Sequence, residues 1–444
     1  MMARTRGLTP WLIVCCGTLF YCFNYFLRVS PSTMQDQLTQ AFHMNATQFG
    51  TLAVFYYWAY TPMQLPAGLL YDKFGVRAVL GAACLIAVTG LAVFIQSNSY
   101  AMAGAGRFLI GLGCAFSYIG TLKLASLWLP PHRFATAAGF TTAAGMASGA
   151  LAQKYLTPMV DAIGYQNALR GCLLTGILLS IMLITLVRNQ PKATVKTAAM
   201  QNPINTRQLF NALKLICSSR QMWLIGGIGC LLYLPSSVFL DVWGIPYLKA
   251  VYNLTAEQAS STTGFTFWGW ILAGPIIGMM SDRIQRRKLP LMLTGFFAAV
   301  LLCCVFYIPN FATLSTLNII FFFVGFCCGA HHLCFALAKE SNPIQISGTA
   351  VAVTNMLIMT GGSVFQPVVG KLLDLHATTI GANGLPVYTA SDYAFALSII
   401  PLGVSLGIVL STFLKETHCQ SQATPAQERL AAGLEGDVAL EPAR

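Results

Sequence analysis

Apolar runs of about twenty residues recur along nearly the whole chain and are separated by short polar segments. An α-helix rises about 1.5 Å per residue, so about 20 apolar residues cross the apolar core of a bilayer, which is about 30 Å thick. The pattern predicts an all-α membrane protein with twelve transmembrane helices, six in each half. The predicted spans are 10–30, 47–70, 77–95, 103–128, 134–156, 168–187, 222–240, 257–280, 289–308, 315–338, 348–372 and 391–414.

Composition excludes a water-soluble fold. Hydrophobic residues make up 56% of the chain and charged residues 9%, against about 45–50% and about 25% in soluble domains. The first span follows Arg4 and Arg6 and runs on without a small-residue cleavage site, so we expect a retained anchor. In the twelve-span arrangement, 20 of the 26 Lys and Arg residues fall on the side of the N-terminus. This asymmetry predicts that both termini and the central loop are cytoplasmic.

The polar segments divide the chain. We expect a cytoplasmic N-terminus, a first six-helix bundle, a cytoplasmic linker, a second six-helix bundle and a disordered cytoplasmic tail, at 1–9, 10–187, 188–221, 222–414 and 415–444. The linker contains a candidate amphipathic surface helix at 206–216. Most of the 14 cysteines lie in apolar spans, so we predict neither a disulfide framework nor a metal site.

Two segments of the chain are repeated at one offset. GLLYDKFGVR at 68–77 returns in degenerate form as GMMSDRIQRR at 278–287, and FHMNATQFG at 42–50 aligns with YNLTAEQAS at 252–260. Two matches in one register, each beside a long apolar run, indicate a duplicated, pseudo-symmetric transporter.

The first repeated segment fits, at every fixed position, the signature between helices two and three of the major facilitator superfamily, which the chain resembles over about residues 8–416. RFLIGLG at 107–113 is similar to that family's fourth-helix pattern of an arginine followed by two glycines. The resemblance implies the major facilitator fold and rocker-switch alternating access, and it links Arg107 to proton coupling. A structural arginine at a helix end is the alternative role for Arg107.

The two signature copies are candidate gates. We expect Asp72 to pair with Arg77 and Asp282 with Arg287, while the carboxylates face the N-terminal ends of spans eleven and five. Such contacts form only when the cytoplasmic side is shut. The alternative is that these are ordinary loop charges that follow the positive-inside rule.

Polar residues at mid-span depth are the candidates for solute binding. The residues that we predict to bind solute are Asn24, Tyr25, Arg28, Tyr57, Tyr60, Tyr118, Tyr233, Trp268 and Asn355. Arg28 binds a carboxylate if it faces a water-filled cavity, or is a snorkelling charge if it lies one turn further out. Tyr233 precedes a proline-broken stretch that ends at Asp241.

Three more residues are candidates for coupling or gating. His331 and His332 are the only histidines well inside a span, and a group that titrates near pH 6.5 could bind a transported proton. Packing histidines are the alternative. Lys123 lies deeper toward the cytoplasm and is a candidate gate or anchor.

YFLRVSPSTM at 25–34 and WGIPYL at 243–248 resemble the bacterial branch of intraphagosomal amino-acid transporters, related to lysosomal dipeptide carriers. We therefore predict a monomeric carrier in a bacterial inner membrane that imports an amino acid or short peptide with protons. The alternatives are a polycarboxylate or siderophore carrier and a receptor without transport. No enzyme motif and no phosphate-binding loop occurs. We expect no cofactor other than a proton gradient as energy source, and no nucleic-acid partner.

Overall fold

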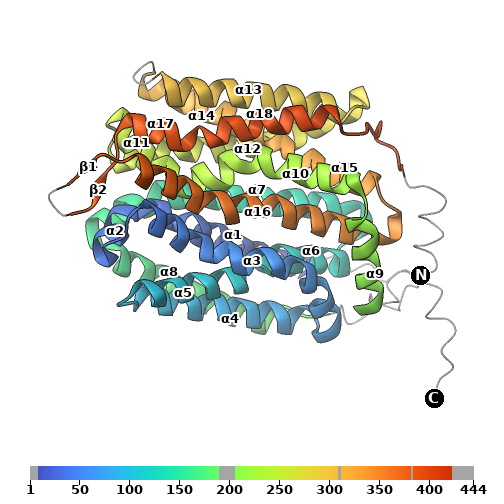
Figure 1. The fold of residues 1–444 in the computed structure, drawn as a ribbon. Coiled ribbons are helices and arrows are strands. Elements are labelled where there is room, and N and C mark those ends of the chain that lie inside the picture. Colours follow the sequence, from blue (N-terminus) through green and yellow to red (C-terminus); the bar gives the residue numbers. More distant parts are fainter. Residues whose placement is uncertain (1–8, 190–205, 309–311, 382–383, 423–444) are drawn as a thin grey trace, which may run out of the picture.

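The computed structural model describes residues 9–189, 206–308, 312–381 and 384–422. Its long helices lie side by side along one axis, with the two halves of the chain in adjacent layers (Figure 1). The helices of the first half are α1 (Thr9–Thr33), α2 (Gln35–Phe42), α3 (Ala46–Phe74), α4 (Val76–Ile95), α5 (Tyr100–Cys114), α6 (Ser117–Trp128), α7 (Pro131–Ile163) and α8 (Tyr165–Leu186).

A short helix, α9 (Thr206–Cys217), precedes the second half and matches the predicted helix at 206–216. The helices of the second half are α10 (Arg220–Leu234), η2 (Pro235–Trp243), α11 (Gly244–Tyr252), α12 (Ala256–Ile284), α13 (Lys288–Tyr307), α14 (Leu314–Cys328), η3 (Gly329–His332), α15 (Leu333–Glu340), η4 (Ile344–Ile346), α16 (Ser347–His376), α17 (Ala390–Leu397) and α18 (Ile399–Thr412). Strands β1 (Thr379–Ile380) and β2 (Pro386–Val387) form a small antiparallel pair that the sequence did not predict.

Each of the twelve predicted spans coincides with a helical region, which confirms the all-α membrane class. The boundaries are less accurate. α7 continues to Ile163 and the seventh region to Tyr252, beyond the predicted ends at 156 and 240, because each helix continues past its apolar stretch until a residue leaves helical geometry. Those residues are Gly164, with φ 79°, and Asn253, with φ 53°.

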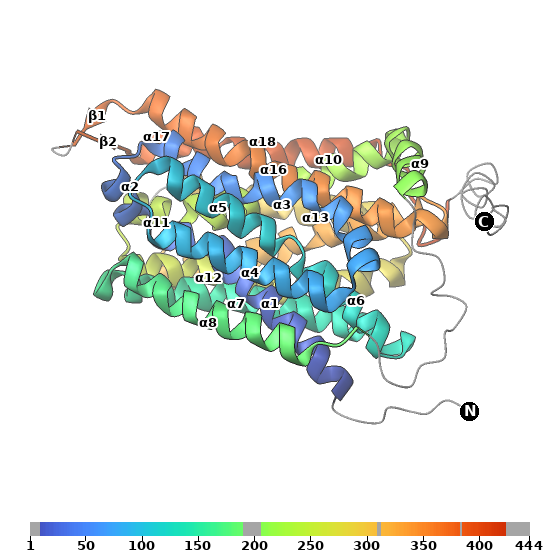
Figure 2. The same cartoon turned by 90° about the horizontal axis from the view of Figure 1, so that it is seen from below.

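Helices at the boundary between the halves are the least apolar. Ten helical regions in the described part of the chain are long and apolar enough to cross a membrane, and α3 and α7 are not among them. Both are long, but α3 packs against α16 and α7 against α12. A helix that faces protein on several sides needs less apolar surface than one that faces lipid. Figure 2 gives a second view of these packed layers.

The duplication extends to the helix caps. Asn45 begins α3 with a capping box to Gln48, and Thr255 begins α12 with a capping box to Gln258. In each case the cap side chain accepts from the third backbone N–H, and the glutamine side chain accepts from the cap backbone N–H. The repeated glutamines therefore have the same structural role in both halves.

The two ends of the bundle differ in how the halves meet. We call the end with Asp72 and Asp282 the signature end, and the other the far end. At the far end Asp36 forms an ion pair with Lys249, and the carboxylate of Asp374 accepts from the backbone N–H groups of Ala46 and Thr47, at 3.1 and 2.8 Å.

Around Asp72 and Asp282 at the signature end, beyond the hydrogen bond between Gln64 and Asn355, the described residues make no hydrogen bond between the halves. A Cβ placed at Gly68 or at Gly278 would meet no atom within 4 Å. Polar contacts of Asp36 and Asp374 therefore join the halves at the far end, and the described residues have no equivalent of them at the signature end. The predicted contacts of Asp72 and Asp282 with spans eleven and five do not form in this state.

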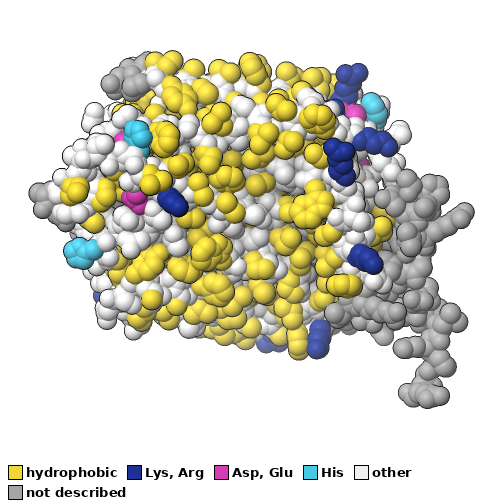
Figure 3. Space-filling view, in the orientation of Figure 1, with side chains coloured by type: hydrophobic (Ala, Val, Ile, Leu, Met, Phe, Trp, Pro, Cys, Tyr) yellow, Lys and Arg dark blue, Asp and Glu magenta, His cyan; other side chains and the backbone are white. Residues whose placement is uncertain are grey.

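Basic side chains gather at the signature end. Figure 3 shows most of the visible Lys and Arg side chains at this end, beyond a broad apolar belt. α9 lies there too (Figure 1). The distribution agrees with the charge asymmetry of the sequence.

The segment after α18 corrects a prediction. We expected the chain from 415 onward to be disordered, but residues 415–422 fold back onto the second signature copy. Glu416 accepts hydrogen bonds from the backbone N–H groups of Arg287 and Lys288, and the Gln422 N–H donates to the Glu340 carbonyl. The rest of the predicted tail, from 423, lies outside the described residues.

Candidate functional site

A buried ion pair joins the halves near the middle of the bundle. Arg28 of α1 donates from Nε to Asp241 Oδ2 of η2 at 2.9 Å, and its Nη2 lies 2.9 Å from the same oxygen. The side chains are 4% and 2% exposed. Tyr57 donates its hydroxyl to Asp241, and Arg28 Nη2 donates to the Tyr233 hydroxyl at 2.7 Å. In this state Arg28 is a paired internal charge rather than a snorkelling one.

Aromatic rings surround the guanidinium. The centroids of Tyr25, Tyr57 and Tyr233 lie 5.2, 5.2 and 5.7 Å from Arg28 Cζ. Cations are stabilised over aromatic faces within about 6 Å. These three predicted site residues are therefore brought together with Arg28, around a charge that no water shell covers.

Asp241 owes its position to an irregular helix. Pro235 begins η2, a nine-residue π-helical stretch, and π-helical turns are frequent at functional sites because they redirect side chains. Gln366 Nε2 of α16 donates to the Ser237 carbonyl at 2.6 Å, and Gln153 Nε2 of α7 donates to the Leu240 carbonyl at 3.1 Å. Side-chain amides from both halves thus satisfy backbone groups in the stretch that carries Asp241.

Arg107 is a second buried cation. It is 2% exposed, donates from Nη1 to the Leu27 carbonyl at 2.8 Å, and lies 5.3 Å from the ring centroid of Tyr56. Its Nε has no hydrogen-bond partner, and no carboxylate of the described residues forms an ion pair with it. Arg28, Arg107 and Asp241 therefore leave one formal positive charge in the middle of the bundle.

A polar network extends from this region in the first half. Asn24 Nδ2 donates to Ser117 Oγ at 3.0 Å, and the Tyr56 hydroxyl donates to Asn24 Oδ1. The Tyr56 and Tyr60 rings stack at 5.4 Å. Tyr118 lies further along, with its ring 4.9 Å from Tyr21. Asn24 and Tyr60 thus adjoin the Arg28 region, whereas Tyr118 lies at its edge.

Asn355 and Lys123 lie closer to the signature end. Asn355 Nδ2 of α16 donates to Gln64 Oε1 of α3 at 3.2 Å, across the boundary between the halves. Lys123 Nζ forms an ion pair with Asp72 at 2.6 Å. This pair corrects the predicted partner of Asp72, because Arg77 turns instead to the end of α8 and donates from Nε to the Ile184 carbonyl at 2.6 Å. The predicted pairing of Asp282 with Arg287 occurs, at 2.7 Å.

One predicted tryptophan points away from the site. Trp268 is 45% exposed on the outer face of α12, whereas Trp270 is 2% exposed and faces inward. Two residues along a helix correspond to a turn of about 200° at about 3.6 residues per turn. The Trp270 ring lies 5.4 Å from Tyr233 and 5.2 Å from His331, so Trp270 occupies the place that we predicted for Trp268.

The two histidines lie at the edge of the Arg28 region. Their rings are 4.2 Å apart, and His331 is 4.9 Å from the Tyr233 ring. Tyr233 thus contacts both Arg28 and His331, and connects the ion pair to the histidine pair.

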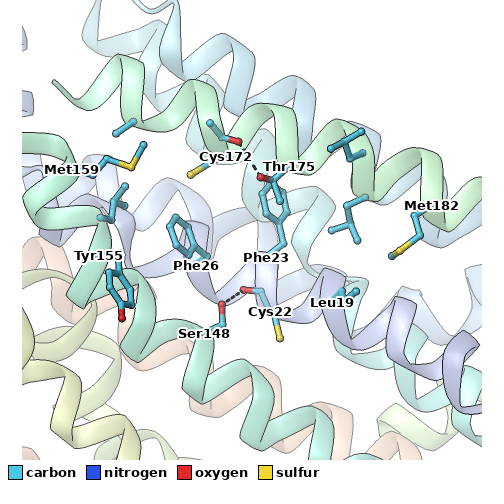
Figure 4. Close-up of a pocket in the computed structure, with 15 residues that line it drawn as sticks. Leu19, Cys22, Phe23, Phe26, Ser148, Tyr155, Met159, Cys172, Thr175 and Met182 are labelled. Atoms are coloured by element: carbon cyan, nitrogen blue, oxygen red, sulfur yellow. Dashed lines mark hydrogen bonds between the residues drawn. The ribbon is translucent and has the colours of Figure 1, made fainter. Parts of the chain in front are cut away.

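A sizeable cavity lies away from the ion pair. A groove of about 660 Å³ lies between α1, α7 and α8 and is lined largely by apolar side chains, including Phe23, Phe26 and Met159 (Figure 4). Its Ser148 hydroxyl donates to the Cys22 carbonyl at 2.8 Å. A groove of this kind suits a hydrocarbon chain and lacks charges for a polar solute.

Sequence reasoning missed four residues of this arrangement: Asp241, Gln153, Gln366 and Trp270. Asp241 had a detectable signal, since it is an acid directly after an apolar span and six residues after Pro235, and acids within the membrane are usually paired. Gln366 had one as a polar residue at mid-span depth, although it was not among the predicted site residues. Gln153 had none, because its role depends on a carbonyl of another helix.

Residues 14–367 match the family model of the Major Facilitator Superfamily. The chain belongs to this superfamily. It is a multi-pass membrane transporter and not an enzyme.

Its relatives include transporters named for carboxylates. It is 27% identical over 294 residues to the uncharacterized transporter YybO of Bacillus subtilis (strain 168), and the alignment covers 61% of this chain and 66% of that protein. It is 23% identical over 409 residues to the probable galactarate/D-glucarate transporter GarP of Escherichia coli (strain K12), covering 83% and 89%.

Solved structures share the fold. A bacterial homolog of the human lysosomal transporter Spinster, in an inward-facing and unoccupied conformation, superposes with a TM-score of 0.69 at 14% identity. The alignment covers 98% of this chain and 99% of that one.

Proposed function

We propose that this transporter carries a small organic acid, that Arg28 binds a carboxylate of the solute, and that a proton moves with it. The observation that carries the proposal is the buried Arg28–Asp241 pair. The pair supports the proposal because a buried guanidinium lies between the halves and already binds the carboxylate of Asp241.

Solute and Asp241 then compete for one cation. A carboxylate that takes Arg28 leaves Asp241 buried without its partner, which costs several kcal/mol. Protonation of Asp241 removes that cost. Entry of the anion and of a proton are thereby linked, because each state with an unpaired buried charge is disfavoured.

Charge favours a solute with two carboxylates. Arg28 and Arg107 contribute two positive charges, and a dianion with a protonated Asp241 balances them. Arg107, which lacks an acidic partner, would hold the second carboxylate. The named relative GarP, a probable galactarate/D-glucarate transporter, supports a sugar diacid of this kind.

An amino acid or short peptide is the second candidate. Its carboxylate would replace Asp241 on Arg28, and its ammonium group would replace Arg28 on Asp241. The adjacent opposite charges of the pair favour this candidate, since they match a zwitterion. In this case Asp241 stays ionised and no proton is needed to balance it.

Alternating access supplies the transport step. If the signature end is on the cytoplasmic side, the structure corresponds to an inward-open state. In this state the contacts of Asp36 and Asp374 keep the far end, on the outer side, closed. Opening to the outside breaks these contacts and closes the signature end. The direction that we propose is import, into a bacterial cell across its inner membrane, by a monomer.

The test is ligand binding by the purified protein. D-glucarate, L-alanine and L-alanyl-L-alanine are compared by thermal shift, since a ligand that binds the native state raises its melting temperature. We expect D-glucarate to raise it in wild type and in Arg170→Gln, a surface control, but not in Arg28→Gln. A shift from alanine or the dipeptide alone supports the second candidate. No shift from any of the three contradicts the proposal.

Coupling is tested in proteoliposomes. Asp241→Asn mimics the protonated acid and leaves Arg28 free, so we expect it to exchange labelled for unlabelled D-glucarate but not to accumulate it in response to a pH gradient. Accumulation equal to that of wild type would show that Asp241 does not carry the proton.

A further inference from the structure

A second, smaller cavity lies inside the second half, between α12 and the η3–α15 region of the tenth span. Its volume is about 230 Å³, and its lining includes the small residues Ala273, Gly274, Gly278, Gly329 and Ala336. One water molecule occupies about 30 Å³ of liquid, so the crevice has room for several.

The crevice connects two polar sites. His332 lines it at one end, and Asp282 and Arg287 of the second signature copy line it at the other. Along α12 its lining runs from Ala273 to Asp282, nine residues, which at about 1.5 Å per residue is about 14 Å. It thus reaches from the signature end to the histidine pair.

The histidines are set for proton binding. They lie on η3, a 3₁₀ turn within an otherwise α-helical span, and such turns often mark functional sites. Nδ1 of His331 contacts the Cys328 carbonyl at 2.9 Å, and Nδ1 of His332 contacts the Gly329 carbonyl at 2.8 Å. Neither Nε2 makes a hydrogen bond with the described residues. Each ring thus keeps one nitrogen for a proton.

We propose that this crevice is a water-filled proton path from the signature end to His332, separate from the path of the solute. The inference rests on the proposed proton coupling and adds the route. His332 exchanges protons with water, His331 lies next to it, and Tyr233 lies between His331 and Arg28.

Four helices pack against the histidine pair, and α10 and α1 contribute the titratable and charged groups. Tyr233 of α10 faces His331, and Arg28 of α1 lies near enough to repel its charged form. Trp270 of α12 and Phe335 of α15 contribute uncharged rings. Asp282 and Arg287 stand only at the crevice mouth. The two rings are 4.2 Å apart, so protonation of one imidazole disfavours protonation of the other and the pair can take up at most one proton.

Histidine C2 hydrogen–deuterium exchange, read by mass spectrometry, tests the path without any solute. The protein is reconstituted in nanodiscs, and exchange at each histidine is followed against pH. We expect exchange at His332 to have a sigmoidal pH dependence, and exposed His43 at the end of α2 is the reference for the labelling reaction. A His332 that neither exchanges nor titrates overturns the proposal.

A filled crevice should stop this exchange. A Cβ at Gly274 meets no atom within 4 Å, so Gly274→Leu places a side chain in the crevice without moving the backbone. Gly227→Leu is the control, because Gly227 has equal space and does not line the crevice. We expect Gly274→Leu to slow exchange at His332 at least about tenfold, since exchange then needs local opening. His43 should not change. Equal rates in both variants overturn the proposal.

Cysteine labelling gives a second measurement. Ala336 lines the crevice, whereas Ala338, two residues along α15, is buried and does not. A membrane-impermeant thiol reagent should label Ala336→Cys faster than Ala338→Cys, and equal labelling contradicts a water-filled path. Neither measurement uses a solute. A failure of D-glucarate to bind would therefore refute the proposed function without deciding whether the crevice carries protons, which exchange and labelling measure directly.

Discussion

The two signature copies share a sequence pattern but not a set of contacts. In the first, Asp72 and Lys123 form one exposed ion pair, with side chains 26% and 35% exposed. In the second, Arg287 is 8% exposed and bonds to Asp282, Glu340 and Ser281, at 2.7, 2.7 and 2.9 Å. Duplication thus placed equivalent acids at equivalent positions, and the neighbouring helices determined their partners.

The segment after α18 accounts for much of the difference. Glu416 accepts from two backbone N–H groups at the start of α13, where a helix N-terminus favours an anion. Thr417 Oγ1 donates to Glu340 Oε2 at 2.6 Å. The first copy has no comparable segment in the described part of the chain. The second copy is therefore held by more polar contacts than the first.

The largest expected effect comes from removing Arg287, the arginine that bonds to both acids of the second signature copy. Arg287→Ala leaves Glu340 and Asp282 without their cation, and we expect a loss of about 3 kcal/mol of stability. The matched change in the first copy, Lys123→Ala, should cost about 0.5 kcal/mol, since its pair is exposed. Melting temperatures of the purified variants in one detergent decide the matter. Equal losses would show that the copies do not differ as described.

A smaller effect is expected when Glu416 loses its charge. Glu416→Gln weakens hydrogen bonds to the N–H groups of Arg287 and Lys288, and we expect it to cost about 1 kcal/mol. Gln420→Glu is a control for a charge change in the same segment without those contacts. A melting temperature as low in the control as in Glu416→Gln would show that the hydrogen bonds of Glu416 do not themselves stabilise the protein.

The effect of Glu416 should depend on pH. Burial raises the pKa of this carboxyl, but the N–H groups of Arg287, Lys288, Thr417 and His418 lower it more, so the pKa lies below the ordinary 4.5. A lowered native pKa stabilises the fold above the ordinary value and loses that effect as pH falls through the native one. The gap in melting temperature between wild type and Glu416→Gln should be constant near neutral pH and shrink below about 4.5. A gap that widens on acidification contradicts this assignment.

The smallest effect concerns the turns that follow the acids. Gly75 has φ 80° and Gln285, which stands where the signature has its second glycine, has φ 51°. Gln285 has left-handed geometry, with ψ 39°, which costs a residue with a side chain roughly 1 kcal/mol. Gly75 has ψ 153°, a backbone conformation that is essentially limited to glycine. We expect Gln285→Gly to stabilise the protein by about 0.5 kcal/mol and Gly75→Ala to destabilise it by about 1 kcal/mol, measured by the same melts. Opposite signs would contradict the costs assigned to these two backbone conformations.

Particular residues show how far the sequence reaches. The spans, the duplication and Arg28 were all predicted, because each depends on local pattern or on a charge where charge is rare. Arg287 and Asp282 lie five residues apart on one turn, so their pairing was predicted correctly. Asp72 was given the wrong partner, since Lys123 comes from another helix 51 residues away. Trp268 was chosen over Trp270 because the direction of a helical face cannot be read from a span that is apolar all round.

By itself the sequence determined the membrane class, the twelve spans and the duplication, since each follows from hydrophobic length or from a repeated local pattern. Only the tertiary structure decided that Arg28 faces Asp241, that Gln153 and Gln366 support the π-helical stretch, and that a crevice leads to His332. These depend on how helices from distant parts of the chain rotate against one another. A buried pair such as Arg28 and Asp241 can form only when all the helices that carry and surround it are in place.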